Sequence, residues 1–207
     1  MLPRQSSTLR QAQAALTRSR IADAARTLFL DAGYVATSVS AIAAAAGVSV
    51  QTIYNVVGNK AAVLSAVLDL VAAGPESPRL VPEFLEERSR HAPDVPAMVD
   101  LLVEWFIDVH PRTASLWAVI RQAAAVDEEV ADLERRRADR RLSNYVGAAA
   151  RARELGGLTS SVTDEEAAAA IWALGHPDAY RALVLVRGWT LDAYGTWLRY
   201  GLTALLG

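Results

Sequence analysis

The chain has 207 residues, of which 52% are hydrophobic, with a net charge of −2 and no cysteine. This length suffices for one domain or two small ones, and the lack of cysteine excludes disulfides, thiolate zinc sites and cysteine nucleophiles. The longest charge-free apolar runs, such as residues 167–175, are far shorter than the ~20 residues that cross a bilayer. The first residues lack the apolar core of a secretory signal. We therefore expect a cytoplasmic globular protein with no membrane partner.

Charge is distributed unevenly along the chain. Residues 1–60 contain six basic and two acidic residues, a net charge of +4, whereas residues 61–207 contain 15 basic and 21 acidic residues, a net charge of −6. Phosphate contacts from basic side chains supply most of the non-specific affinity of proteins for DNA. If the protein meets a polyanion, the N-terminal part is therefore expected to do so.

Apolar residues recur at intervals of three and four in every segment with a readable period, which predicts an all-α fold. The first helix is expected to begin at a cap at Thr17 and to stop at Gly33. The second ends at Gly47, the third follows Ser49, and the fourth begins after Asn59 as cap.

The composition changes after these four helices. Five of the eight prolines lie between residues 74 and 96, which predicts a connector with at most a short helix over residues 83–90. Beyond it, the apolar pattern predicts helices over approximately 95–109, 113–125, 127–155, 163–175, 177–187 and 191–206.

The second and third helices are short and joined by a tight turn, as in a helix-turn-helix, whose second helix enters the major groove of DNA. Gly47 can adopt the left-handed conformation of such a turn, and Ser49 can cap the next helix. Val50, Ile53 and Val57 are expected to hold that helix on its neighbours. The candidate DNA-binding residues are Thr37, Ser38, Ser49, Val50, Gln51, Thr52, Tyr54, Asn55 and Lys60.

These candidates have different expected roles. A Gln side chain can pair with adenine through two hydrogen bonds, and Thr can contact a thymine methyl group, a base edge or a phosphate. Gln51 and Thr52 are therefore expected to read bases. The candidate phosphate contacts are Thr37, Ser38, Tyr54 and Lys60.

The segment "RSRIADAARTLFLDAGYVATSVSAIAAAAGVSVQTIYNVVGNKAAVLSAVL", residues 18–68, resembles the DNA-binding domain of TetR-family transcriptional regulators. The resemblance rests on the order and spacing of Phe29, "AGY" at 32–34, "TSV" at 37–39, "AAGVS" at 45–49, and "TIY" at 52–54 followed by Lys60. It implies a ligand-controlled dimer, usually a repressor, that binds a palindromic operator and leaves it when a small molecule fills the C-terminal domain.

Two positions depart from the family pattern. The family commonly has an aromatic residue where this chain has Val57, and often His or Tyr where it has Asn55, so the operator cannot be taken from any relative. With the domain boundary placed near the start of the proline-rich connector, we expect a flexible arm over residues 1–16, a helix-turn-helix DNA-binding domain over 17–72, and a helical effector-binding and dimerisation domain over 73–207.

Aromatic residues gather in the second half of the chain. Most are expected in the core, but an interhelical pocket lined by aromatics with a few polar groups is the usual form of a small-molecule site. Arg137 and Arg141 share a predicted helix face with apolar residues, and whether they meet an effector or solvent is left open. The candidate effector-binding residues are Trp105, Trp117, Arg121, Tyr145, Trp172 and His176.

The histidines show no metal-binding pattern such as HExxH. His110 and His176 each precede a proline, and the interpretation we favour is a capping or buried core position. No GxSxG, GxGxxG or GKS/T motif occurs, so we expect no catalytic residues, metal or cofactor.

The last predicted helix has two apolar faces, and a helix packed on a single core needs only one. The second face is then available to a partner's identical surface, so a homodimer built from the helices at 163–175 and 191–206 is expected. One face of the last helix consists of Leu191, Tyr194, Leu198, Leu202 and Leu205, and the other consists of Ala193, Trp197, Tyr200 and Ala204.

Two other interpretations of the function stay open. The protein could be a constitutive or architectural DNA-binding protein without an effector, or a ligand-binding or scaffold protein that has lost DNA binding.

Overall fold

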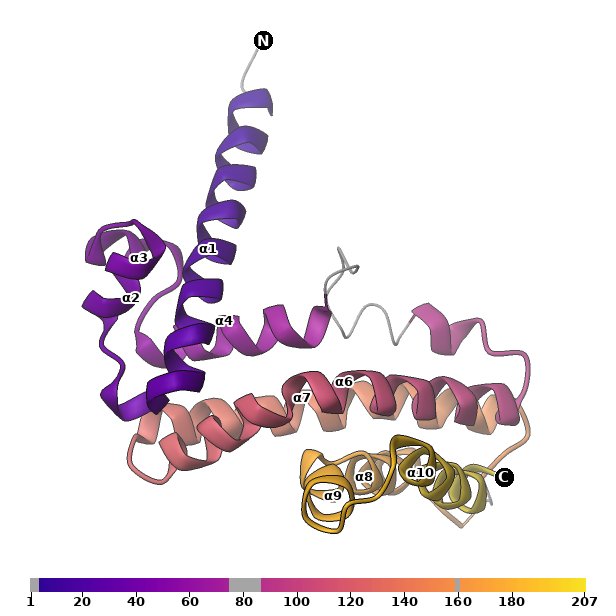
Figure 1. The fold of residues 1–207 in the computed structure, drawn as a ribbon. Helices are drawn as coiled ribbons and strands as arrows, with labels where there is room; N and C mark the ends of the chain where they lie inside the picture. The colour runs from indigo at the N-terminus through magenta and orange to yellow at the C-terminus, as the bar shows by residue number, and fades with distance from the viewer. Residues whose placement is uncertain (1–3, 75–86, 159–160) are drawn as a thin grey trace. The chain divides into compact units, whose positions relative to one another are not determined.

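In a computed structural model, residues 4–74, 87–158 and 161–207 are described, and the side chains from residue 12 onward. These residues form helices and no strand, which confirms the predicted all-α fold (Figure 1). The chain forms two compact units. Unit 1 comprises residues 1–74 and 115–134, and unit 2 comprises residues 75–114 and 135–207.

Helix α1 (Arg4–Ala36) is longer than the sequence predicts and has a kink at Gly33, where φ is 79°. Thr17 is not its cap, because the residue lies inside the helix and its Oγ1 donates to the carbonyl of Gln13 at 2.9 Å. No proline or glycine lies between residues 4 and 16, and Arg, Gln, Ala and Leu favour helix. The helix therefore includes most of the segment that the sequence predicts as a flexible arm.

The next three helices begin and end close to their predicted positions. Ser38, Ser49 and Asn59 each accept a hydrogen bond from the backbone N–H three residues ahead, which satisfies one of the free amides of a helix N-terminus. These caps explain the three starting points. The helices are α2 (Val39–Ala46), α3 (Val50–Val56) and α4 (Lys60–Ala73).

The core of unit 1 joins these helices to a later part of the chain. Side chains with no exposed surface, such as Phe29 and Ile53, belong to the same apolar cluster as Leu116, Ile120 and Val130. This cluster explains why residues 115–134 belong to unit 1, whereas the sequence-based division at 72 and 73 assigns them to the second domain. Apolar pattern identifies which residues are buried but not which partner buries them.

Helix α6 (Val95–Ala124) is continuous through Pro111, so the predicted break between residues 109 and 113 is wrong. Proline inside a helix removes one hydrogen bond and crowds the preceding turn. Here the residues around it, including Val109, His110 and Thr113, are buried, and this packing offsets the cost. The hydroxyl of Thr113 also donates to the carbonyl of Val109 at 2.9 Å.

The remaining helices follow the prediction closely, except that the helix expected over 177–187 is a short α-helix followed by a π-helical segment. Of the short helix expected over 83–90, residues 87–90 are described and are helical, and the rest lies outside the described residues. The elements are α7 (Glu128–Glu154), α8 (Asp164–Leu174), α9 (Pro177–Tyr180), η1 (Arg181–Val186) and α10 (Leu191–Leu206).

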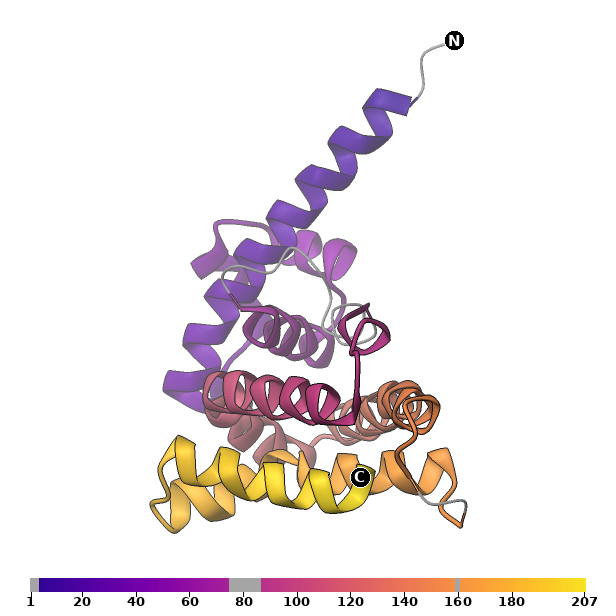
Figure 2. The ribbon, with the colours of Figure 1, turned by 90° about the vertical axis from the view of Figure 1, so that its right-hand side faces the viewer.

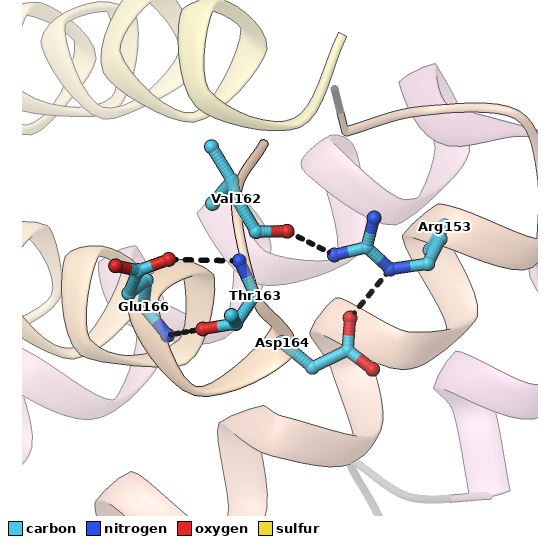
Figure 3. A network of polar contacts seen from close by, with 5 residues as sticks. All are labelled: Arg153, Val162, Thr163, Asp164 and Glu166. Atoms are coloured by element: carbon cyan, nitrogen blue, oxygen red, sulfur yellow. Dashed lines mark hydrogen bonds and ion pairs between the residues drawn. The ribbon is translucent and has the colours of Figure 1, made fainter. Parts of the chain in front are cut away.

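The N-terminus of α8 is fastened by a reciprocal pair of hydrogen bonds (Figure 3). The Glu166 N–H donates to Thr163 Oγ1 at 3.1 Å, and the Thr163 N–H donates to Glu166 Oε2 at 2.8 Å. Arg153 of α7 donates to Asp164 Oδ1 at 2.8 Å and to the carbonyl of Val162. This capping box sets the start of α8 and ties it to α7.

Helices α8 and α10 lie side by side within unit 2 (Figure 2). A Cβ atom at Gly201 would lie 3.0 Å from a methyl carbon of Leu174, so the glycine permits the close approach of the two helices. Tyr194, Leu198 and Leu202 of α10 have no exposed surface. One face of α10 is thus part of the core of unit 2.

Candidate nucleic-acid interface

Helices α2 and α3 are joined by three residues and bent by 95° at this junction. Gly47 has φ 64° and ψ 39°, the left-handed conformation that the sequence predicts, and its N–H donates to the carbonyl of Ala44. Arg20 of α1 donates to the carbonyl of Ala46 at 2.7 Å. The bend, the short turn and the left-handed glycine are those of a helix-turn-helix.

Among the described helices, no single one is long and apolar enough to cross a bilayer.

Helix α3 is anchored differently from the prediction. Ile53 is its buried residue, with no exposed surface, and Val57 packs against the core of unit 1 from the position after the helix. Val50 is 39% exposed, so its expected anchoring role is wrong. At the N-terminus, Ser49 Oγ accepts from the Thr52 N–H at 3.0 Å and lies 2.8 Å from Thr52 Oγ1.

The polar residues of α3 lie on its accessible side. Gln51 and Asn55 are exposed, Tyr54 is 50% exposed, and Thr52 is partly buried. Gln51 Nε2 donates to Asn55 Oδ1 at 2.9 Å. Four side chains of a type that binds bases and phosphates thus lie on α3, which is held by buried Ile53 and by Val56 and Val57 packed against the same core.

Thr37 and Ser38 have different positions although they are neighbours. Thr37 is 3% exposed, and its hydroxyl donates to the carbonyls of Gly33 at 2.8 Å and Leu28 at 3.2 Å. Its side chain therefore binds the kinked end of α1 and is not available to a phosphate. Ser38 is exposed, caps α2 and lies 2.9 Å from Ser40 Oγ.

Lys60 lies in the first turn of α4, with Nζ 4.1 Å from the centre of the Tyr34 ring and 3.5 Å from the carbonyl of Val35. Partial burial lowers the pKa of Lys60, and the nearby Asp127 carboxylate opposes this effect. The ammonium is thus held by a cation–π contact beside the end of α1.

A polar cluster that the sequence analysis does not identify links the start of α7 to these helices. The Tyr34 hydroxyl donates to Asp127 Oδ2 at 2.8 Å, and Asn59 Nδ2 donates to Glu129 Oε2 at 2.8 Å. Burial, with the Asp127 hydrogen bond second, raises the pKa of Tyr34. The partners are 93 and 70 residues apart in the chain, so no local pattern indicates them.

The six candidate effector-binding residues fall into different units. Trp117 and Arg121 belong to unit 1, where Trp117 is buried in the core. The other four belong to unit 2, in which the Trp172 and His176 rings meet edge to face at 4.9 Å. An open cavity of about 500 Å³ in unit 2 includes none of the six, and it is lined by Glu87, Arg88, His91, Ala92, Pro93, Ala97 and Leu101.

The two histidines that precede prolines have the roles that the sequence analysis favours. His176 caps α9, with Nδ1 accepting from the Asp178 N–H at 3.2 Å. His110 is 4% exposed, and its Nδ1 lies 3.0 Å from the Tyr194 hydroxyl. Burial lowers the pKa of His110 to about 3, so the ring is neutral near pH 7. Within the described ranges, no group of three or more acidic or histidine side chains could hold a metal ion.

The bent, capped helix pair with its exposed polar residues defines a helix-turn-helix DNA-binding domain. Residues 21–67 match the family model for bacterial regulatory proteins of the tetR family. No curated protein matches the chain in sequence.

Solved structures resemble the whole chain. NalD, the secondary repressor of the MexAB-OprM multidrug efflux pump in Pseudomonas aeruginosa, is 25% identical, with a TM-score of 0.69 over 93% of this chain and 96% of NalD. SmeT in a complex with triclosan is 24% identical, with a TM-score of 0.71 over 91% of this chain and 90% of SmeT. GusR of Salmonella enterica is 22% identical, with a TM-score of 0.65 over 92% of this chain and 95% of GusR.

The N-terminal segment is therefore a tetR-family DNA-binding domain, and the fold of the whole chain is that of TetR-family transcriptional regulators. The resemblance stated from the sequence is confirmed. This family is one of regulators and not of enzymes.

Proposed function

We propose that the protein is a cytoplasmic, ligand-responsive transcriptional repressor that binds a palindromic DNA operator as a homodimer and is released by a small molecule. The observation that carries the proposal is α3, whose exposed Gln51, Tyr54 and Asn55 have no role in the core. NalD, with a similar fold, is a repressor. The net charge of +4 in residues 1–60 favours the same face for DNA.

Base recognition and phosphate binding are assigned to different residues. Gln51 and Thr52 read bases, while Tyr54, Lys60 and Ser38 bind phosphates and so set the register on the duplex. Ser49 and Val50 lie at the start of α3, where a recognition helix approaches the base edges. Thr37 contributes by holding the end of α1, since its hydroxyl is already bound to two carbonyls.

The homodimer is built from α8 and α10. Tyr194 and Leu198 on one face of α10 have no exposed surface, whereas Tyr200 on the other face is 75% exposed, beside exposed Ala193 and Ala204. Trp197 of this second face packs partly against the core of unit 2, but the exposed part of the face suits an identical face of a second copy, which forms a contact with two-fold symmetry. A monomeric mass at micromolar concentration in solution contradicts this assignment.

The effector is assigned to the C-terminal part of the chain, with Trp105, Trp117, Arg121, Tyr145, Trp172 and His176 as candidate contacts. SmeT, which has a similar fold, is solved with triclosan bound. A ligand shifts a conformational equilibrium only by binding one state more tightly. The coupling is reciprocal: if the effector weakens operator binding by some factor, operator DNA must weaken effector binding by the same factor.

The first experiment is selection of bound genomic fragments, followed by affinity measurements with two variants. Gln51→Ala should cost about 1–3 kcal/mol and relax the preference at one base position, whereas Lys60→Ala should weaken binding to all sequences and reduce the salt slope by about 1. Arg26→Ala removes a positive charge from an exposed position of α1 and is the charge control. Fragments without an inverted repeat refute the proposal.

The second candidate function is a DNA-binding regulator without an effector. The observation that favours it is that none of the six candidate contacts lines the described cavity. Titration of small aromatic compounds, followed by tryptophan fluorescence and operator release together, separates the two functions. A compound that quenches fluorescence saturably and also releases the operator supports the repressor, and binding without release contradicts the coupling for that compound.

A further inference from the structure

Gln51 and Asn55 form a hydrogen-bonded pair on the exposed face of α3. They are four positions apart, so their side chains share one face of the helix. Gln51 Nε2 donates to Asn55 Oδ1 at 2.9 Å, and both side chains are exposed. The donor is on Gln51 and the acceptor on Asn55, which gives the pair a direction.

This direction determines what Gln51 presents to a ligand. A Gln amide has two N–H donors and one carbonyl oxygen, and one N–H is bound to Asn55. The remaining N–H and Oε1 form one donor beside one acceptor. If the amide flipped, Oε1 would face Asn55 Oδ1, and two acceptors would oppose each other. With Asn55 Oδ1 in this position, Asn55 disfavours the flipped Gln51 amide.

A fixed donor beside a fixed acceptor distinguishes the purines. In the major groove adenine presents the acceptor N7 and the donor N6, which match this arrangement, whereas guanine presents two acceptors, N7 and O6. We propose that Asn55 is a positioning residue that orients the Gln51 amide and so makes the protein select adenine over guanine at one operator position. The inference rests on the proposed DNA-binding function.

The pair contributes little to the folding of α3 itself. An exposed pair at this spacing changes a helix–coil equilibrium by less than about threefold. The helix is held instead by buried Ile53 and by the Ser49 cap. Loss of the pair should therefore alter base preference while leaving the fold intact, which separates a positioning role from a structural one.

The experiment uses the full-length protein and two operator duplexes that differ by adenine or guanine at the position whose preference Gln51→Ala relaxes. The readout is the ratio of the two dissociation constants. Asn55→Leu has nearly the same shape as Asn but no acceptor, and this ratio should fall about three- to tenfold. Asn55→Asp keeps the acceptor, so its ratio should stay within about twofold of the wild type, although its charge weakens binding to both duplexes.

A double-mutant cycle tests whether Asn55 acts through Gln51. In a Gln51→Ala background, Asn55→Leu should leave the ratio unchanged. If Asn55→Leu still changes the ratio of the two dissociation constants in that background, Asn55 reads the base itself and the inference is overturned. The inference is also overturned if Asn55→Leu alone leaves this ratio unchanged, or if Asn55→Asp lowers it as far as Asn55→Leu is expected to.

The failures of the two proposals are distinguishable. A wild-type protein that selects no inverted repeat overturns the proposed function and this inference with it. A wild-type protein that selects a repeat in which Gln51→Ala changes no base preference overturns the inference and the assignment of Gln51 to base reading, but not the binding of a palindromic operator. Circular dichroism of each variant shows that the fold is retained.

Discussion

Acidification is expected to destabilise unit 2 through one residue, His110. The ring lies in an aromatic cluster, with Phe106 at 5.5 Å, Tyr180 at 5.7 Å and Tyr194 at 6.0 Å between ring centres. Burial lowers the pKa of His110 from 6.5 to about 3, and the positive charge of Arg141 acts in the same direction. A backbone hydrogen bond to Gly175 opposes the shift without cancelling it.

The pH range follows from the direction of this shift. Because the pKa of His110 is lower in the folded protein than in the unfolded chain, the unfolded chain binds the extra proton between about pH 6.5 and 3. The free energy of unfolding is therefore highest above pH 6.5 and decreases as the pH falls through this range. One proton corresponds to about 1.4 kcal/mol per pH unit, so the loss at pH 5 relative to pH 8 is roughly 2 kcal/mol.

The assay is urea unfolding of the wild type and His110→Gln at pH 5, 6, 7 and 8, followed by circular dichroism at one protein concentration. Gln does not titrate but offers an acceptor for Tyr194 and a donor for the Gly175 carbonyl. The difference in free energy of unfolding between the two proteins cancels the contributions of all other titrating groups. It should move by roughly 2 kcal/mol in favour of the variant between pH 8 and pH 5, and parallel pH profiles refute the argument.

Three further substitutions test individual contacts, each by the midpoint of urea unfolding at pH 7.5. Tyr34→Phe removes the hydrogen bond to Asp127 and should cost about 1–2 kcal/mol; an unchanged midpoint means that the bond contributes nothing. Gly175→Ala places a Cβ 2.0 Å from Phe106 Cζ and should cost at least ~2 kcal/mol; full stability means that the ring moves freely. Thr163→Ala removes the cap of α8 and should cost about 1 kcal/mol, with Thr163→Ser close to the wild type.

The helix-turn-helix could be predicted from the sequence because its signals are local. A serine or asparagine before an apolar period caps the helix within three residues, as Ser38, Ser49 and Asn59 do. Gly47 has a left-handed backbone that depends only on its own missing side chain. None of these features requires a contact with a distant segment, so the helix ends follow from a few neighbouring residues.

The predictions fail where distant packing outweighs a local signal. Pro111 indicates a helix end, but buried residues on both sides keep α6 continuous. The sequence predicts Thr37 as a phosphate contact, but its hydroxyl donates to the carbonyl of Gly33 at the kink of α1. The Tyr34–Asp127 bond joins residues that only the folded core of unit 1 brings together.

Helix α3 explains why the class of protein can be read from the sequence while the operator cannot. The residues that hold it, Ile53 in the core and Ser49 at the cap, are constrained by packing and by the helix terminus. Gln51 and Asn55 face solvent, where substitutions usually change the free energy of unfolding by less than about 0.5 kcal/mol. Base preference can therefore change without loss of the fold. The operator that we propose for this chain therefore cannot be taken from NalD, which is 25% identical over a shared fold.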